Sequence, residues 1–171
     1  MKIAVVTDST AYLTKEEYAE YGIYVLPMSV IFGQETYREE IDITAEEFYA
    51  KVKSSPVFPT STQPAVGETY ELFRELAKDY DAIIPITISS GISGTYQTCV
   101  AVAEDMKDEI AIYPIDSEIS CAPQARAVKL AAIMAKSGEY SPEEIVETVQ
   151  RLVDRTTAYF IVDDLSNLQR G

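Results

Sequence analysis

Residues 83–95 read IIPITISSGISGT, and they give the strongest indication of the fold. Its first half, Ile83–Ile88, is apolar and β-branched, which is typical of a buried strand. Its second half, Ser89–Thr95, is rich in serine and glycine. Apolar residues then recur at the spacing of one helix face: Tyr96, Cys99, Val100 and Ala103. The stretch therefore predicts a strand, a tight turn and the start of a helix.

The turn after this strand has the features of an anion-binding loop. Gly91 and Gly94 let the backbone approach a ligand closely, and the first N–H groups of the next helix have no partner within it. Ser90, Ser93 and Thr95 add hydroxyl donors. A serine-capped turn without a ligand is the alternative, and the spacing alone leaves both interpretations open.

The length and charge narrow the class of protein. The 171 residues suit one domain with a sizeable core. With 14 Lys and Arg against 28 Asp and Glu, the net charge of −14 repels nucleic acid and anionic lipid surfaces. The apolar run Lys2–Val6 meets Asp8 too soon for a signal peptide, and no stretch approaches the roughly 20 apolar residues of a membrane span. We expect a cytoplasmic protein with no nucleic-acid partner and no membrane insertion.

The supply of reactive side chains is small. The chain has no histidine, and Cys99 and Cys121 form no CxxC pair, which excludes the common zinc sites. A Ser-His-Asp mechanism lacks its base, and the serine-rich loop lacks the lysine of a phosphate-binding P-loop. We expect no metal and no cofactor, and we expect both cysteines to be buried.

Strand and helix patterns alternate along the chain. Strands are expected over residues 2–6, 23–26, 82–88, 110–115 and 157–162. Helices are expected to begin near residues 15, 45, 67, 93, 123 and 142. Capping boxes mark some of these starts: Thr14 with Glu17, Thr44 with Glu47, and Ser141 with Glu144. This order predicts an α/β fold, a parallel sheet flanked by helices on both faces.

The region between the second strand and the third helix departs from this alternation. Met28–Phe32 and Glu35–Arg38 predict a small hairpin. Ser54–Pro64 is irregular and contains three prolines, although Val57 and Phe58 within it are expected to be buried.

Parallel sheets bind ligands outside the carboxyl ends of their strands. In this chain that edge should gather Thr7–Thr10, Ser89–Thr95, Asp116–Ser117 and Asp163–Asp164. Asp8 is expected to be a capping or loop-bracing carboxylate, with a nucleophile or metal ligand as the alternative. Hydroxyl groups dominate the remaining side chains, which favours a binding site.

Ordered motifs along the whole chain resemble the DegV family of bacterial fatty-acid-binding proteins. They are Thr-Asp-Ser-Thr at 7–10, Pro-Thr-Ser-Thr-Gln-Pro at 59–64, Ser-Ser-Gly-Ile-Ser-Gly-Thr-Tyr-Gln at 89–97, and Val-Asp-Asp-Leu at 162–165 with Leu168. The resemblance implies a carrier, not an enzyme. Such a carrier buries a long-chain fatty acid and presents its carboxylate to a kinase subunit that forms the acyl phosphate.

The resemblance also implies the residues that hold the carboxylate. They fall on Ser61, with Thr62 beside it, and on Ser93 in the turn that Gly94 and Thr95 complete. The order Ser-Thr replaces the usual Thr-Ser of the family, so Thr60, Ser61 and Thr62 all stay candidates.

Length is the largest difference from the family. Members continue past a Gly-Gly-Arg-Ile stretch into a C-terminal domain that closes the acyl pocket and supplies a histidine. This chain ends at Gln169-Arg170-Gly171. Residues 1–171 are therefore expected to form the N-terminal domain, with the second domain missing. Two other functions stay open: an enzyme acting on phosphate esters or sugar phosphates through Asp8, and a scaffold that docks the missing domain.

Overall fold

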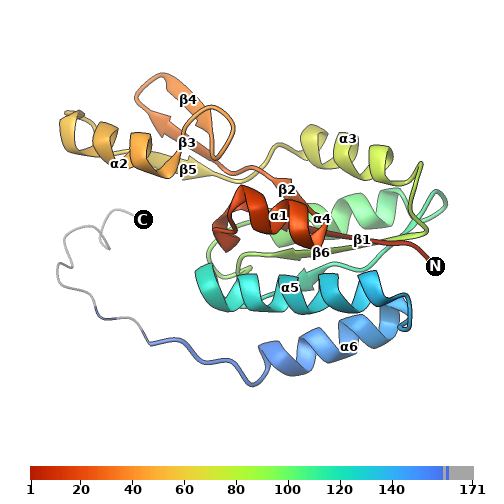
Figure 1. Cartoon of the computed structure of the whole chain (residues 1–171). Coiled ribbons are helices and arrows are strands. Elements are labelled where there is room, and N and C mark those ends of the chain that lie inside the picture. The colour runs from red at the N-terminus through yellow and green to blue at the C-terminus, as the bar shows by residue number, and fades with distance from the viewer. Residues whose placement is uncertain (160, 162–171) are drawn as a thin grey trace.

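The computed structural model describes residues 1–159 and 161, and a parallel sheet forms its centre (Figure 1). Within those residues the sheet is five-stranded: β1 (Ile3–Asp8), β2 (Ile23–Leu26), β6 (Ala82–Thr87), β7 (Ala111–Ile112) and β8 (Ile115–Asp116). The order is β2-β1-β6, and both β7 and β8 pair with β6. The predicted parallel sheet is confirmed.

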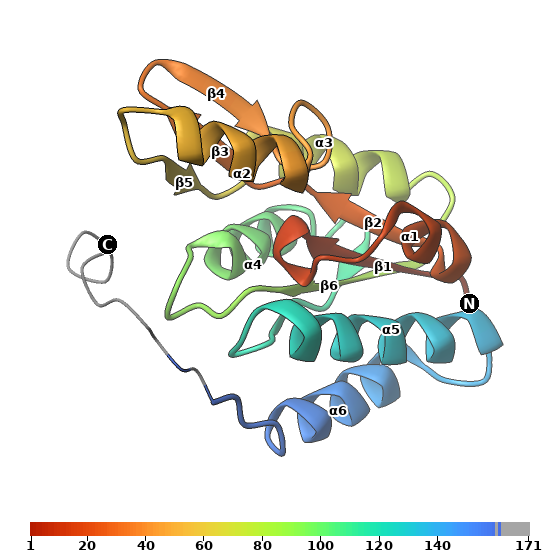
Figure 2. The ribbon, with the colours of Figure 1, turned by 60° about the vertical axis from the view of Figure 1, so that its left-hand side comes forward.

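Helices cover both faces of this sheet (Figures 1 and 2). On one face lie α1 (Lys15–Tyr21), α5 (Cys121–Ser137) and α6 (Pro142–Val153), and on the other lie α3 (Val66–Leu76) and α4 (Thr95–Asp105). Side chains alternate along each strand, so Val5 packs in the α5 core while its neighbour Val6 packs in the α4 core. The capping boxes predicted at Thr14, Thr44 and Ser141 are all formed.

A second, smaller layer lies at one end of the molecule (Figure 2). Here β3 (Ser29–Phe32), β4 (Glu35–Arg38) and β5 (Thr60–Thr62) form an antiparallel sheet, in the order β4-β3-β5 within the described chain. Helix α2 (Ala45–Ser54) packs on it. The buried residues of this layer belong to neither main core: Val30, Phe32 and Ile43, with Tyr37, Phe48 and Val52 against them. We call residues 29–62 the small unit.

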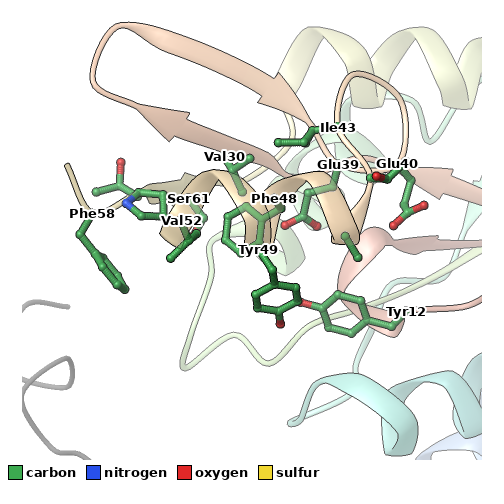
Figure 3. A pocket seen from close by; sticks show the side chains of 14 residues that line it. Tyr12, Val30, Glu39, Glu40, Ile43, Phe48, Tyr49, Val52, Phe58 and Ser61 are labelled. Carbon is green, nitrogen blue, oxygen red and sulfur yellow. The ribbon is translucent and has the colours of Figure 1, made fainter. Parts of the chain in front are cut away.

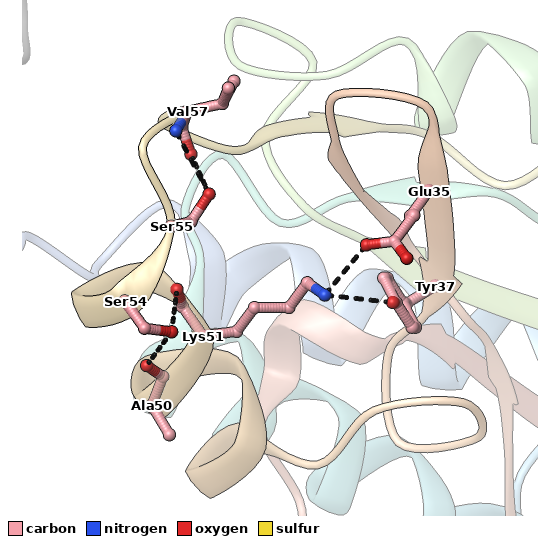
Figure 4. Close-up of polar contacts among 7 residues, drawn as sticks. All are labelled: Glu35, Tyr37, Ala50, Lys51, Ser54, Ser55 and Val57. Atoms are coloured by element: carbon pink, nitrogen blue, oxygen red, sulfur yellow. Dashed lines mark hydrogen bonds and ion pairs between the residues drawn. The ribbon is translucent and has the colours of Figure 1, made fainter.

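Polar contacts fasten α2 to the hairpin of the small unit (Figure 4). Lys51 Nζ donates to Glu35 Oε2 (2.9 Å) and to Tyr37 OH (3.1 Å). After the helix, the Ser55 hydroxyl bridges to the backbone of Val57 and turns the chain toward β5. The hairpin prediction is confirmed, whereas β5 within the stretch interpreted as irregular was not predicted.

Some sequence predictions are wrong. The strand expected over 110–115 is interrupted at Tyr113 and Pro114. Residues 157–159 and 161 are not in a strand; the rest of the predicted last strand, and the motif at 162–168 with Asp163 and Asp164, lie outside the described residues. Val57 and Phe58 are about half exposed, at 51% and 52%. Cys99 is buried as predicted, but Cys121 is exposed.

Candidate functional site

The carboxylate of Asp8 ends β1 and is fully buried. Its Oδ1 accepts hydrogen bonds from the Thr10 amide (3.0 Å), the Thr10 hydroxyl and Gln124 Nε2 (3.1 Å), and its Oδ2 accepts one from the Ile88 amide (2.7 Å). The carboxylate therefore fixes the loop after β1 to the loop after β6. This geometry favours the bracing role over a nucleophile, which would need an exposed and unoccupied oxygen.

A second carboxylate, at the end of β8, holds the serine-rich loop from the other side. Asp116 Oδ1 accepts from the Ser90 amide (3.1 Å) and the Glu118 amide (2.9 Å). The Ser89 amide donates to Ile119 O (2.8 Å). As predicted, the loops after β1, β6 and β8 meet at one edge of the sheet, and the acidic groups there fasten the backbone.

The serine-rich loop ends at the N-terminus of α4. Ser93 Oγ lies 2.9 Å from Thr95 Oγ1 and accepts a hydrogen bond from the Thr95 amide (3.4 Å). Thr95 is buried, and its hydroxyl also contacts Met28 Sδ (3.7 Å). The Thr98 amide then donates to Gly94 O (3.0 Å). The N–H groups before it point out of the helix end, where the helix dipole favours an anion.

The register of β5 separates the three candidate hydroxyls of residues 60–62. Ser61 pairs with Val30, while Thr60 pairs with Ile31 and Thr62 with Ser29. Paired residues of antiparallel strands place their side chains on the same face, and neighbours along a strand alternate. Ser61 therefore lies on the face of Val30, and both residues line a pocket (Figure 3). Thr60 and Thr62 follow the alternation toward the other face of the strand, although Thr60 still borders the pocket and Thr62 does not.

That pocket has a volume of about 350 Å³ and lies between α2 and β5, with Tyr12 and Phe58 at opposite ends (Figure 3). Most of its lining is apolar: Val30, Ile43, Phe48, Tyr49, Val52 and Phe58. Tyr49 is 63% exposed and borders the pocket mouth. Glu39 also lines the pocket, and its Oε2 accepts from Ser9 Oγ (2.6 Å). A pocket of this size is at the lower end for small-molecule sites.

A glutamine side chain joins the two hydroxyl-bearing segments. Gln63 follows β5, and its Nε2 donates to Thr98 Oγ1 on α4 (2.9 Å). Its Oε1 lies so close to Gly94 that a Cβ added there would overlap it. The segment with Ser61 and the turn with Ser93 are thus side by side. The motif at 59–64 contains Gln63, but sequence reasoning gave this residue no role, because nothing in the local pattern says which element its amide reaches.

The predicted site residues divide into two groups. Thr60 and Ser61 line the pocket, whereas Thr62, Ser93, Gly94 and Thr95 are not part of its lining. Ser93, Gly94 and Thr95 lie at the N-terminus of α4, close to the hydrogen bond between Gln63 and Thr98. Thr62 is exposed on β5. Their role in holding a carboxylate stays a prediction.

Hydroxyl groups at a helix N-terminus and an apolar pocket, carried by an α/β domain, are features that many small-molecule binding proteins share. The family model described as "Uncharacterised protein, DegV family" matches residues 2–171. The chain belongs to the DegV family.

Similar proteins agree in sequence and in structure. Protein DegV of Bacillus subtilis (strain 168) is 48% identical over 171 residues, which cover 100% of this chain and 60% of that protein. Its crystal structure, described as that of a fatty acid binding protein, superimposes with a TM-score of 0.95. A DegV family protein from Thermus thermophilus, described for its fatty acid binding, is 27% identical with a TM-score of 0.82 over 90% of this chain and 54% of that chain.

The chain spans about 60% of the length of the curated relatives that it matches. In the described part of the chain, no helix is long and apolar enough to cross a bilayer.

Proposed function

We propose that this chain binds a long-chain fatty acid. The carboxylate is held between the Ser61 hydroxyl on β5 and the N-terminus of α4 at Ser93, and the acyl chain lies on the apolar pocket between α2 and β5. The observation that carries the proposal is the Gln63 bridge, which brings the two hydroxyl-bearing segments together next to that pocket.

The physical chemistry of the two ends of the ligand differs. Burial of the acyl chain supplies the affinity, at about 0.8 kcal/mol for each CH₂ removed from water. A carboxylate at a helix N-terminus gains only about 0.3–1 kcal/mol from the dipole, so the head group mainly sets the orientation. The net charge of −14 does not oppose binding, because the hydroxyl and N–H donors act over a few ångströms.

The resemblance extends the proposal to a carrier role. The bound carboxylate would be presented to a fatty-acid kinase subunit, which forms the acyl phosphate in the cytoplasm, and this chain would perform no chemistry itself. The hydrogen bonds that occupy both oxygens of Asp8 support this role, because they leave this carboxylate unavailable as a nucleophile. The rest of the acyl pocket would come from the C-terminal part that the relatives possess.

Mass spectrometry of an organic extract tests the proposal. The chain is purified alone and also extended after Gly171 by the C-terminal part of Bacillus subtilis DegV. We expect a saturated fatty acid to copurify with the extended protein, and Ser93→Ala to reduce its amount. Extracts from both forms that contain no fatty acid, together with no binding of added palmitate, would contradict the proposal.

The carrier role needs a separate measurement. A bacterial fatty-acid kinase and ATP are added to the extended protein loaded with palmitate, and acyl phosphate is trapped with hydroxylamine. If palmitate stays bound but no acyl phosphate forms, the proposal that the chain binds a fatty acid is kept. The proposal that it presents the carboxylate to a kinase is then contradicted.

A further inference from the structure

The small unit has little that fixes it to the rest of the molecule. Its buried residues form a separate core with none in common with the two cores around the parallel sheet. A layer that shares no core with its neighbour is positioned by the few contacts at its boundary. The orientation of residues 29–62 therefore depends on specific polar contacts at the two ends of the unit.

One of these contacts lies where the chain enters the small unit. The Met28 amide donates to Ser9 Oγ (2.9 Å), and the same hydroxyl donates to Glu39 Oε2 (2.6 Å). This contact joins β3 and the segment after β4 to the loop after β1. It restrains β5, at the other edge of the small sheet, only indirectly, through the pairing of β5 with β3.

The other contact lies where the chain leaves the small unit. Gln63 comes directly after β5, donates to Thr98 on the first turns of α4, and fills the space over Gly94. Thr98 is 8% exposed, and its hydrogen bond with Gln63 is partly buried. Ser61 lies two residues before Gln63, and Ser93 lies directly before Gly94.

We infer that Gln63 is a positioning residue: its side chain sets the gap between Ser61 and Ser93 by holding β5 against the N-terminus of α4. The amide of Gln63 acts as a spacer of fixed length between the two groups. The absence of a side chain on Gly94 is what lets the spacer fit. The consequence for ligand binding rests on the proposed function, whereas the spacing itself does not.

If Gln63 sets this spacing, substitutions that remove its contact with α4 should differ from those that keep it. Gln63→Ala removes both the hydrogen bond and the packing, and Gln63→Asn is one CH₂ too short to reach Thr98. Gly94→Ala displaces the flexible end of Gln63 and leaves the helix in place, because the overlapping atom is the end of a side chain. Thr98→Val removes the acceptor, while Thr98→Ser keeps it and should behave as the unmodified protein. Gln34→Ala, at an exposed glutamine in the hairpin turn, is the matched control.

Distance measurements between two spin labels test the spacing. Labels are attached at Thr36→Cys on β4 and Asp108→Cys after α4, in a background carrying Cys121→Ser. The labelled protein with Gln63, Gly94 and Thr98 unchanged should give one narrow distance distribution. The Gln34→Ala and Thr98→Ser variants should give the same distribution. Gln63→Ala, Gln63→Asn and Gly94→Ala should broaden it, with Thr98→Val in between. Distributions that all stay equally narrow would overturn the inference.

Palmitate titration of the same proteins, extended as above, tests the consequence for binding. We expect Gln63→Ala to raise the dissociation constant about tenfold, as expected for the loss of one well-placed hydrogen bond and its packing. If the dissociation constant for palmitate is unchanged while the distance distribution broadens, Gln63 sets the spacing but the spacing does not affect ligand binding. Absence of palmitate binding in every variant would count against the proposed function, and the spin-label distances alone would then decide whether Gln63 is the spacer.

Discussion

Asp8 accepts a hydrogen bond from the backbone amide of Ile88 across 2.7 Å, although 80 residues separate them along the chain. Both groups are buried, and the contact ties the end of β1 to the end of β6. The serine-rich turn thus begins from a fixed point.

Replacement of the Asp8 carboxylate tests whether its hydrogen bonds stabilise the fold. Asp8→Asn removes the charge and turns an NH₂ group toward other donors, so we expect the free energy of unfolding to fall by about 2–3 kcal/mol. Urea denaturation followed by circular dichroism measures it. Asp42→Asn, which alters an exposed carboxylate held by Arg38, should have a much smaller effect. Equal midpoints for the Asp8→Asn variant and the unmodified protein would contradict the brace.

The two thiols should differ in reactivity. Burial raises the pKa of Cys99 to about 12, so this thiol stays protonated and unreactive at pH 8, while Cys121 is exposed. Iodoacetamide treatment followed by peptide mass spectrometry should find the label on Cys121 alone. In urea both cysteines should react. Labelling of Cys99 in the folded protein at the rate of Cys121 would show that the α4 core is open.

Replacing each of two glycines by alanine should change the free energy of unfolding in opposite directions. Gly138 ends α5 with a φ of 71°, and Gly67 lies in the first turn of α3; a Cβ at either would meet nothing within 4 Å. Only the backbone angle differs. Gly138→Ala should therefore cost about 1 kcal/mol, and Gly67→Ala should stabilise by up to ~1 kcal/mol. Thermal unfolding measures both, and equal shifts of the same sign would show that φ is not the determinant.

The register of β5 makes a prediction about the head group. Ser61→Ala should weaken palmitate binding by about tenfold or more, because a hydroxyl that contacts a carboxylate is lost. Thr62→Ala should have little effect, since its side chain lies on the opposite face of the strand and outside the pocket lining. Thr60→Ala, at a residue that only borders the pocket, should weaken binding less than Ser61→Ala. Titration with a fluorescent fatty acid compares the three. A larger loss for Thr62→Ala would mean that the strand pairs differently when the ligand is bound.

Local rules predicted much of the main domain. A capping box needs only two side chains three residues apart, so Thr14 with Glu17 and Ser141 with Glu144 were identified from sequence alone. The buried strands β1 and β6 were evident because each is a continuous apolar run.

Features that depend on distant partners were not predictable in this way. Strand β5 exists because Ser61 pairs with Val30 on β3, and the nearby prolines suggested an irregular loop. Val57 and Phe58 are apolar yet half exposed, and Phe58 borders the pocket, which no local pattern indicates. The role of Gln63 depends on a residue 35 positions later. The site thus needed the three-dimensional structure, whereas the fold largely did not.

Pro59 and Pro64 bracket β5, the strand at the outer edge of the small sheet in the described chain. Proline has no amide hydrogen to donate, so the free edge between them offers only a short ladder to another molecule. The same prolines that concealed β5 in the sequence should limit edge-to-edge association through this strand in concentrated solutions of the protein.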